Sequence, residues 1–332
     1  MNINVQKFST MRNFGIEIEI GNEVSLPILA TVINNFSPHP LRSNLYKHSV
    51  NNNFWDLKLD GSCGKITDCY GINEGGYEIA SFKASGPKQL RHIGKTAKCI
   101  KKTGAKTNEN CGLHIHVDVQ DFSEYDMGKL IAYWLCVEKV ILMSTPRRRW
   151  ANKYCLPLYT DAKPVLNPGK EIDFLEVWNH FKPTNTSAHN NLYRRRTLNV
   201  INWYRYIKVK NFKRSTVEFR FPEGTLVEAN IKNWTILLVN FVHRIKICTG
   251  NIKFNDNLDL EGVLYILGLG HNREEFAILE DSLRETKIWL LRRLIRYCYG
   301  LPVEFFLHAD FSEQACVILK KMGESCDVQR KY

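Results

Sequence analysis

The sequence has no stretch of about eighteen consecutive apolar residues, the length that a membrane-spanning helix requires. Its beginning, MNINVQKFSTMRNFG, contains no apolar core of the kind found in secretion signals. We therefore expect a cytoplasmic protein with no membrane partner. The ten cysteines are scattered and form no CxxC pair, so we predict reduced, largely buried thiols and neither a disulfide framework nor a thiolate zinc site.

Two further absences concern phosphate binding. No segment reads GxxxxGK[ST], so there is no Walker phosphate loop. Acidic residues are missing between Lys182 and Ser215, where nine basic residues are interspersed with aromatic ones. Such a stretch is suited to phosphates or nucleic acid, and the alternative is a solvated basic loop.

The charge of the chain is unevenly distributed. The net charge is +12, yet residues 251–332 hold 11 Lys and Arg against 13 Asp and Glu, which leaves 35 against 21 in residues 1–250. With 44% hydrophobic and 24% charged residues the chain has the composition of a folded globular protein. We predict a catalytic domain over residues 1–250 and a nearly neutral helical extension or subdomain over residues 251–332.

Apolar periodicity predicts an alternation of short strands and longer helices. The predicted strands cover residues 14–20, 54–59, 76–81, 112–119, 197–206 and 215–221. The predicted helices cover residues 26–36, 87–103, 124–143, 172–181, 229–248 and 273–298. Ser123 and Asp126 form an S-x-x-D capping pattern before the third helix, and Gly104 and Gly250 are expected to end two of the helices.

Four predicted strands share one arrangement of side chains. In FGIEIEI isoleucines alternate with Glu17 and Glu19, and in CGLHIHVD apolar residues alternate with two histidines. The strands GGYEIAS and TVEFRFPEG repeat the pattern with single glutamates and an arginine. Each strand therefore has an apolar face and a face of ionisable groups. Carboxylates, imidazoles and a guanidinium are the groups that divalent cations and phosphates require.

Each motif alone has a simpler interpretation. An ExE pair is often a solvated strand face, an HxH pair can be structural, and an ExR pair can be an exposed salt bridge of little energetic value. If the four motifs were unrelated, their ionisable groups would rarely lie on four strands with every apolar neighbour on the opposite face. The combination indicates a binding face.

The motifs occur in the order FGIEIE, DGS, GYEIAS, GLHIHV, RRTLN and TVEFRFPEGT. In this order the chain resembles the amidoligase branch of the glutamine synthetase-like carboxylate-amine ligases, over about residues 12–230. The resemblance implies an α+β fold with a curved antiparallel sheet of about six strands and helices on its outer face. It also implies ATP and Mg²⁺, or Mn²⁺, as cofactors. The implied reaction is amide-bond formation between a carboxylate and an amine, each borne by an amino acid, a peptide or a modified polymer, through an acyl phosphate.

The resemblance also assigns roles residue by residue. The implied metal ligands are Glu17, Glu19, Glu78, His114 and Glu218. The implied catalytic residues are Glu218, Arg220 and His116. The implied contacts to substrate or ATP are Asp60, Ser62, Arg196, Asn199 and Arg220.

Two other functional classes fit parts of the sequence. A metal-dependent phosphodiesterase or nuclease also uses clustered carboxylates and histidines, and the basic excess of residues 1–250 would suit a nucleic-acid substrate. A non-catalytic nucleic-acid-binding protein would explain residues 182–215, but it would not need carboxylates and imidazoles on one strand face. Cleavage of nucleic acid without ATP would identify a nuclease. Salt-sensitive binding of nucleic acid that persists after Glu→Gln substitutions would identify a non-catalytic binding protein.

Overall fold

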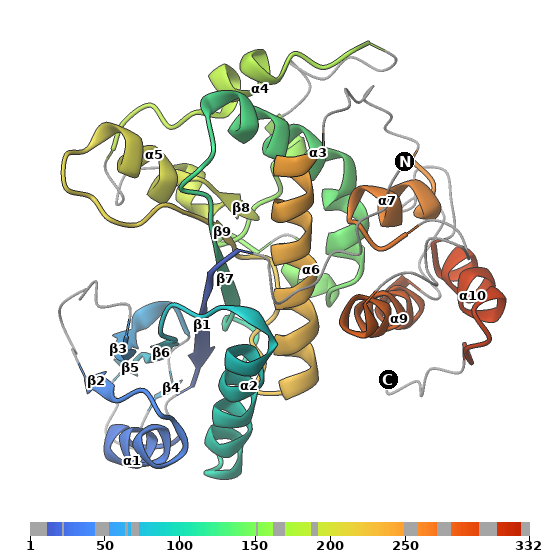
Figure 1. Ribbon diagram of the computed structural model, residues 1–332. Coiled ribbons are helices and arrows are strands. Elements are labelled where there is room, and N and C mark those ends of the chain that lie inside the picture. The colour runs from blue at the N-terminus through green and yellow to red at the C-terminus, as the bar shows by residue number, and fades with distance from the viewer. Residues whose placement is uncertain are drawn as a thin grey trace.

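The structure is a computed structural model, shown in Figure 1. It describes residues 12–21, 23–43, 53–63, 66–67, 73–150, 152–161, 170–186, 192–248, 258–270, 280–298 and 311–326. The strands are β1 (Phe14–Ile20), β2 (Leu41–Ser43), β3 (Trp55–Asp60), β4 (Ile66–Thr67), β5 (Asn73–Glu74), β6 (Gly76–Ala80), β7 (Leu113–Asp118), β8 (Leu198–Asn199) and β9 (Thr216–Phe219).

The α-helices are α1 (Leu26–Phe36), α2 (Gly86–Lys102), α3 (Glu124–Met143), α4 (Phe174–Phe181), α5 (Ile201–Lys208), α6 (Glu228–Ile247), α7 (Leu260–Ile266), α9 (Asp281–Cys298) and α10 (Phe311–Lys321). Short 3₁₀ turns are η2 (Gly61–Cys63), η3 (Arg147–Arg149), η4 (Tyr159–Asp161) and η5 (Leu192–Arg195).

Seven strands form the main sheet in the order β2-β3-β6-β1-β7-β9-β8. From β3 to β8 every neighbouring pair is antiparallel, which gives six antiparallel strands and confirms the predicted α+β class. The edge strand β2 was not predicted and pairs with β3 in parallel. It has three residues, too few for a periodic pattern to be recognised.

Helices that include α6 and α2 cover the apolar face of the sheet. The helix α6 contacts β7 and packs against α2, α3 and α9, and α1 packs against α2 (Figure 1). Ile16, Ile18, Ile115 and Phe219 are at most 1% exposed and point into this core. Since side chains alternate along a strand, burial of the apolar residues leaves the ionisable ones on the opposite face.

Several predicted elements have the expected bounds, and one prediction is wrong. The helix α3 covers the predicted residues 124–143, and Ser123 and Asp126 form the expected capping box. Gly104 follows the end of α2 with a φ of +97°, a left-handed conformation that glycine adopts readily. Residues 197–206 do not form one strand, because β8 ends at Asn199 and α5 begins at Ile201. The β-branched and aromatic residues of this segment favour a strand locally, but tertiary packing buries Ile201 and Trp203 on one side of a helix.

The helices after residue 257 pack onto the rest of the molecule. The helix α7 contacts α3, α9 contacts α3 and α6, and α10 contacts α9. Gly250 and residues 273–279, at the start of the predicted helix 273–298, lie outside the described residues. None of the helices in the described segments is both long and apolar enough to cross a membrane.

Candidate active site

The ionisable side chains of the central strands lie on the face opposite the core. The antiparallel register places Glu17 of β1 directly across from His114 of β7. One strand further, His116 of β7 lies across from Glu218 of β9. Directly paired residues on one face have side chains close enough to contact each other. The sheet thus brings together motifs that are about 200 residues apart in the sequence.

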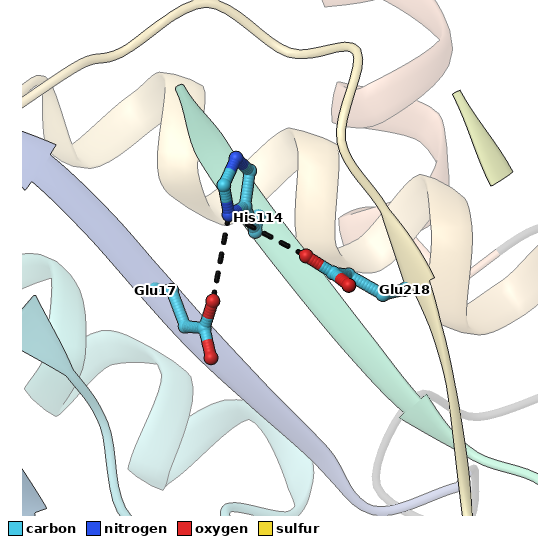
Figure 2. Close-up of side chains that lie close together, drawn as sticks. All are labelled: Glu17, His114 and Glu218. Carbon is cyan, nitrogen blue, oxygen red and sulfur yellow. Dashed lines mark hydrogen bonds and ion pairs between the residues drawn. The ribbon is translucent and has the colours of Figure 1, made fainter. Parts of the chain in front are cut away.

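Figure 2 shows Glu17, His114 and Glu218 converging from three adjacent strands. The His114 Nδ1 atom lies 3.4 Å from Glu17 Oε2 and 3.5 Å from Glu218 Oε1. One potential ligand atom from each of the three residues lies within 4.8 Å of the others. The prediction that the ExE, HxH and ExR strands direct these groups to one side of one sheet is confirmed.

Glu218 is held from two further sides. The Asn199 Nδ2 atom of β8 donates a hydrogen bond of 2.6 Å to Glu218 Oε2, and the Arg220 guanidinium pairs with Oε1. Burial by itself would raise the pKa of Glu218, but the positive charges of Arg220, His116 and His114 outweigh it and lower the pKa. Glu218 is therefore a buried, ionised carboxylate of fixed orientation.

Glu17 and His116 form a second contact within the same cluster. The His116 Nε2 atom lies 3.2 Å from Glu17 Oε1 and 4.0 Å from Glu218 Oε1. The pKa of Glu17 lies well below its ordinary value because the charges and hydrogen bonds of His116 and His114 overcome the effect of burial. Burial would lower the pKa of His116, yet the two glutamates raise it. The carboxylates thus retain their charge and favour a cation beside them.

Glu19 and Glu78 lie across from each other on β1 and β6. Glu19 Oε2 accepts a hydrogen bond of 2.5 Å from the backbone N–H of Gly112, and Oε1 lies 3.5 Å from His114 Nε2. Burial raises the pKa of Glu19 despite the charge of His114. On the neighbouring strand β6, Glu78 forms an ion pair with Lys58, whose Nζ atom lies 2.6 Å from Glu78 Oε1. Burial and the nearby charge of Glu17 raise the pKa of Glu78 to about 7 in spite of Lys58.

Asp60 and Ser62 form a tight turn beside this row. Asp60 Oδ1 accepts hydrogen bonds from the Ser62 backbone N–H at 2.8 Å and from Ser62 Oγ at 2.6 Å. Potential ligand atoms of Asp60, Glu19 and Cys63 also lie within 4.8 Å of one another. Cys63 is buried, as expected for the thiols, but its position beside two carboxylates was not predicted.

All but two of the predicted site residues line one pocket of about 750 Å³, a volume typical of small-molecule sites. His114 is covered by its neighbours, with 3% of its surface exposed. The remaining wall of the pocket includes residues from outside the sheet: Tyr154, Thr186, Arg194, Arg195, Ile201, Asn202, Arg205, Phe212 and Arg214.

The basic stretch therefore contributes to the pocket. Arg194, Arg195, Arg205 and Arg214 have no carboxylate partner among the described residues. The absence of acidic residues between positions 182 and 215 was the sequence signal for these arginines, although single residues could not be selected from it. The sequence interpretation also missed Lys58, which lines the pocket on β3.

Arg196 is directed elsewhere. Its guanidinium pairs with Asp161 and donates a hydrogen bond of 3.1 Å to the carbonyl oxygen of Pro157. The neighbouring Thr197 donates a hydrogen bond to Glu138, a buried glutamate that also accepts the Leu158 backbone N–H at 2.8 Å. These contacts attach the loop before β8 to α3. The predicted contact of Arg196 to substrate or phosphate stays a prediction.

The fold and the donor set together define a class of protein: an antiparallel sheet whose polar face carries a carboxylate–imidazole cluster suited to divalent cations. The chain belongs to the amidoligase family, since residues 10–242 match the family described as "Putative amidoligase enzyme". Family membership supports a carboxylate-amine ligase. The resemblance stated from the sequence motifs is thereby confirmed.

Two solved structures are similar to this chain. A bifunctional glutathione synthetase from Pasteurella multocida aligns with 97% of the chain at a TM-score of 0.42 and 12% identity. The ligase PafA, in its complex with the prokaryotic ubiquitin-like protein Pup, aligns with 98% of the chain at a TM-score of 0.36 and 11% identity. The chain spans 52% of the length of the synthetase and 72% of that of PafA. No curated protein sequence matches this chain.

The residues present fit the divalent cation that the family implies. Glu17 and Glu218 are ionised oxygen donors on either side of His114, an arrangement suited to Mg²⁺ or Mn²⁺. The His116 Nε2 atom lies 3.2 Å from Glu17 Oε1 and 4.0 Å from Glu218 Oε1, so a second imidazole lies beside the same two carboxylates.

Proposed function

We propose that this chain is an ATP-dependent carbon-nitrogen ligase that joins a carboxylate to an amine through an acyl phosphate, with Mg²⁺ or Mn²⁺ as the cation. The observation that carries the proposal is the convergence of Glu17 and Glu218 on the buried His114, where the two glutamates line one pocket together with Arg220. A cation-binding cluster beside a fixed guanidinium meets the main requirements of phosphoryl transfer, which are positioning and neutralisation of charge.

In the first half of the proposed reaction, an oxygen of the substrate carboxylate attacks the γ-phosphorus of ATP, and ADP leaves. Glu17, His114 and Glu218 would hold one cation, which would neutralise charge on the phosphate oxygens. Arg220 is the residue of this chain that would stabilise the transferring phosphoryl group. Its guanidinium is fixed by Glu218 and lines the pocket, so little reorganisation is needed when the charge develops.

Further cation binding is proposed for Glu19 and Glu78. Glu19 lies beside His114 and has its Oε2 atom oriented by Gly112. For Glu78 to bind a cation, its ion pair with Lys58 would have to open. Asp60, Ser62 and Asn199 are proposed contacts to substrate or nucleotide, since each lines the same pocket.

In the second half, the amine attacks the carbonyl carbon of the acyl phosphate, and inorganic phosphate leaves with the electron pair of the broken C–O bond. An ammonium substrate must first lose a proton, because it has no free electron pair, and its nitrogen loses a second proton, to the departing phosphate or to water, as the amide forms. His116 lines the pocket beside Glu17 and is our candidate for contact with the reacting groups. Arg194, Arg195, Arg205 and Arg214 supply positive charge suited to a carboxylate substrate and to the departing phosphate.

Nucleic acid remains a candidate substrate through the same arginines, which would bind its phosphates. A metal-dependent nuclease would cleave nucleic acid with Mg²⁺ alone. A binding protein would retain nucleic acid after Glu→Gln changes at the cluster. A ligase would instead release ADP, with sustained turnover only when both a carboxylate and an amine are supplied.

The experiment that tests the proposal is incubation of the purified chain with ATP, Mg²⁺ and pooled amino acids and peptides. We expect substrate-dependent release of ADP and phosphate and a new amide product detected by mass spectrometry. Division of the active pool then identifies the carboxylate and the amine. Nucleic-acid cleavage without ATP, together with no ADP release from any pool, would contradict the proposal.

A substitution at Glu218 links this activity to the site. Glu218→Gln keeps the volume of the side chain and removes its charge, so we expect turnover and Mn²⁺ affinity to fall by about 100-fold or more. Stability without metal should also fall, because Arg220 loses its buried ionic partner. The matched control is Glu176→Gln at an exposed position on α4, which should leave all three measurements unchanged. Full turnover in Glu218→Gln would remove Glu218 from the catalytic residues.

A further inference from the structure

Arg293 of α9 is a buried arginine outside the segment that matches the amidoligase family. Its Nε atom donates a hydrogen bond of 2.7 Å to the carbonyl oxygen of Ser144, directly after α3. Its Nη2 atom donates a hydrogen bond of 2.6 Å to Glu223 Oε1. Its guanidinium also lies 5.0 Å from the ring centre of Trp289 and 5.2 Å from that of Trp234. The planar group is thus fixed by contacts in several directions.

Glu223 follows β9, the strand that carries Glu218. Arg293 and Glu223 are each 7% exposed, and the second carboxylate oxygen of Glu223 has no hydrogen-bond partner in the described part of the chain. A buried ion pair is a poor source of stability, because an apolar pair of similar size is often equally stable. The pair of Arg293 and Glu223 can instead fix the position of the backbone at Glu223.

The backbone at Glu223 is joined directly to the start of β7. Glu223 forms an isolated antiparallel bridge with Gly112. The Gly224 N–H donates to the Cys111 carbonyl oxygen at 2.9 Å, and the Leu113 N–H donates to that of Pro222 at 3.1 Å. A Cβ at Gly224 would lie 2.6 Å from the Cys111 Cβ, so the two segments are in close contact. A shift of residues 222–224 would therefore move residues 111–113.

Residues 111–113 support the cation-binding cluster. The Gly112 N–H holds Glu19 Oε2 at 2.5 Å, and His114 follows two residues later. A continuous path of contacts thus runs from Arg293 through Glu223 and Gly112 to Glu19 and His114.

We propose that Arg293 is a positioning residue for the cation-binding face. Through Glu223 it fixes residues 222–224, and through them the Gly112 N–H that orients Glu19. The C-terminal helical region, in this proposal, completes the geometry of a site whose cation ligands all lie before residue 219. The inference rests on the proposed cation site but not on the proposed ligase reaction.

The test compares substitutions of Arg293 in the full chain, with Mn²⁺ as the probe. Arg293→Met should weaken Mn²⁺ binding, measured by electron paramagnetic resonance of the free ion, by about tenfold, as loss of a ligand-orienting contact typically does. Arg293→Lys, which retains the charge but only part of the hydrogen bonding, should weaken it less. The control is Arg292→Met on the same helix, since Arg292 is exposed and pairs with Glu324.

A double substitution separates position from stability. Arg293→Met with Glu223→Leu replaces the ion pair by apolar groups, so the melting temperature should recover towards that of the parent protein. We expect Mn²⁺ affinity to stay low and hydrogen exchange at the Gly112 amide to be faster than in the parent protein. Parent-like Mn²⁺ affinity and Gly112 exchange in the double variant would overturn the proposal. If the parent protein binds no Mn²⁺, the proposed cation site fails, and Gly112 exchange alone decides whether Arg293 fixes this backbone.

Discussion

At Gly112 an added Cβ would lie 2.8 Å from His114 Nε2 and 3.3 Å from Glu19 Oε2. Such separations require the neighbouring side chains to move. A methyl group at this position would therefore displace two residues of the candidate site while leaving the apolar core on the other side of β7 unchanged. The effect of the substitution should be local.

We predict that Gly112→Ala lowers Mn²⁺ affinity by about 10- to 100-fold, because Glu19 and His114 can no longer adopt their positions. The unfolding transition should shift only slightly. Isothermal titration calorimetry with Mn²⁺, together with urea unfolding, measures both quantities. Gly61→Ala is the control, since its Cβ would have no neighbour within 4 Å. Mn²⁺ affinity of Gly112→Ala equal to that of the parent protein would mean that the region around Gly112 does not form the cation site.

Period-two alternation predicted which ionisable residues share a face, and this part of the site needed no tertiary information. Glu17, Glu19 and His114 could be grouped because every apolar neighbour lies on the opposite side of its strand. The pairing of Glu78 with Lys58 could not be predicted, because it depends on β6 lying next to β3. The direction of Arg196 likewise depends on η4, which supplies Asp161.

At the scale of elements, the start of α3 combines a local motif with a tertiary contact. Asp126 Oδ2 accepts the Ser123 backbone N–H at 2.9 Å, completing the capping box. The same oxygen is bound by Lys246 Nζ of α6 at 2.7 Å. Burial would raise the pKa of Asp126, but the hydrogen bonds from Lys246 and Ser123 outweigh it and lower the pKa. Asp126 therefore joins the ends of two long helices.

The lowered pKa determines how Asp126 contributes to stability across pH. The contribution is fully present above the unfolded-state pKa of about 3.9 and is lost as pH falls through the lower folded-state value. We predict that Asp126→Asn lowers the free energy of unfolding by about 1 kcal/mol near neutral pH, and that this difference disappears at strongly acidic pH. Urea unfolding from pH 7 downwards tests the prediction. Glu124→Gln, in the same helical turn but half exposed, should change stability by less; a constant Asp126→Asn effect across pH would contradict the ionic interpretation.

The strand error at residues 197–206 shows where local pattern fails. Ile201 and Trp203 alternate as in a strand, and such residues favour strands on propensity alone. The structure forms a helix there, and that helix places Asn202 and Arg205 in the pocket, three residues apart on one helical face. The choice depends on packing of Trp203 against Trp178 of α4, which sequence spacing does not reveal.

For the molecule as a whole, the sequence allowed a family-level interpretation only up to about residue 230, and the family match ends at residue 242. Composition after residue 250 indicated neutral helices, and α7, α9 and α10 are helices packed against the preceding part or each other. The contact of Arg293 with Glu223 could not be predicted from the sequence, because it joins residues 70 positions apart. The division into two domains stays a prediction.

The ligand requirements of the whole molecule give the last prediction. Ionised carboxylates on the sheet face disfavour a free triphosphate, whereas the arginines that line the same pocket favour one, so we expect ATP and the divalent cation to bind well only together. A ligand at about 100 times its Kd stabilises the native state by about 2.7 kcal/mol. For a chain of 332 residues that corresponds to a rise in Tm of about 4 °C. Differential scanning fluorimetry with ATP alone, Mg²⁺ alone and both measures the expected cooperativity.

The Glu218→Gln variant, compared with Glu176→Gln, should lose most of the joint shift because the cation then lacks a charged ligand. A parent protein whose Tm is unchanged by millimolar Mg²⁺ and ATP together would contradict the ATP-dependent ligase, and the nucleic-acid alternatives would then be tested first.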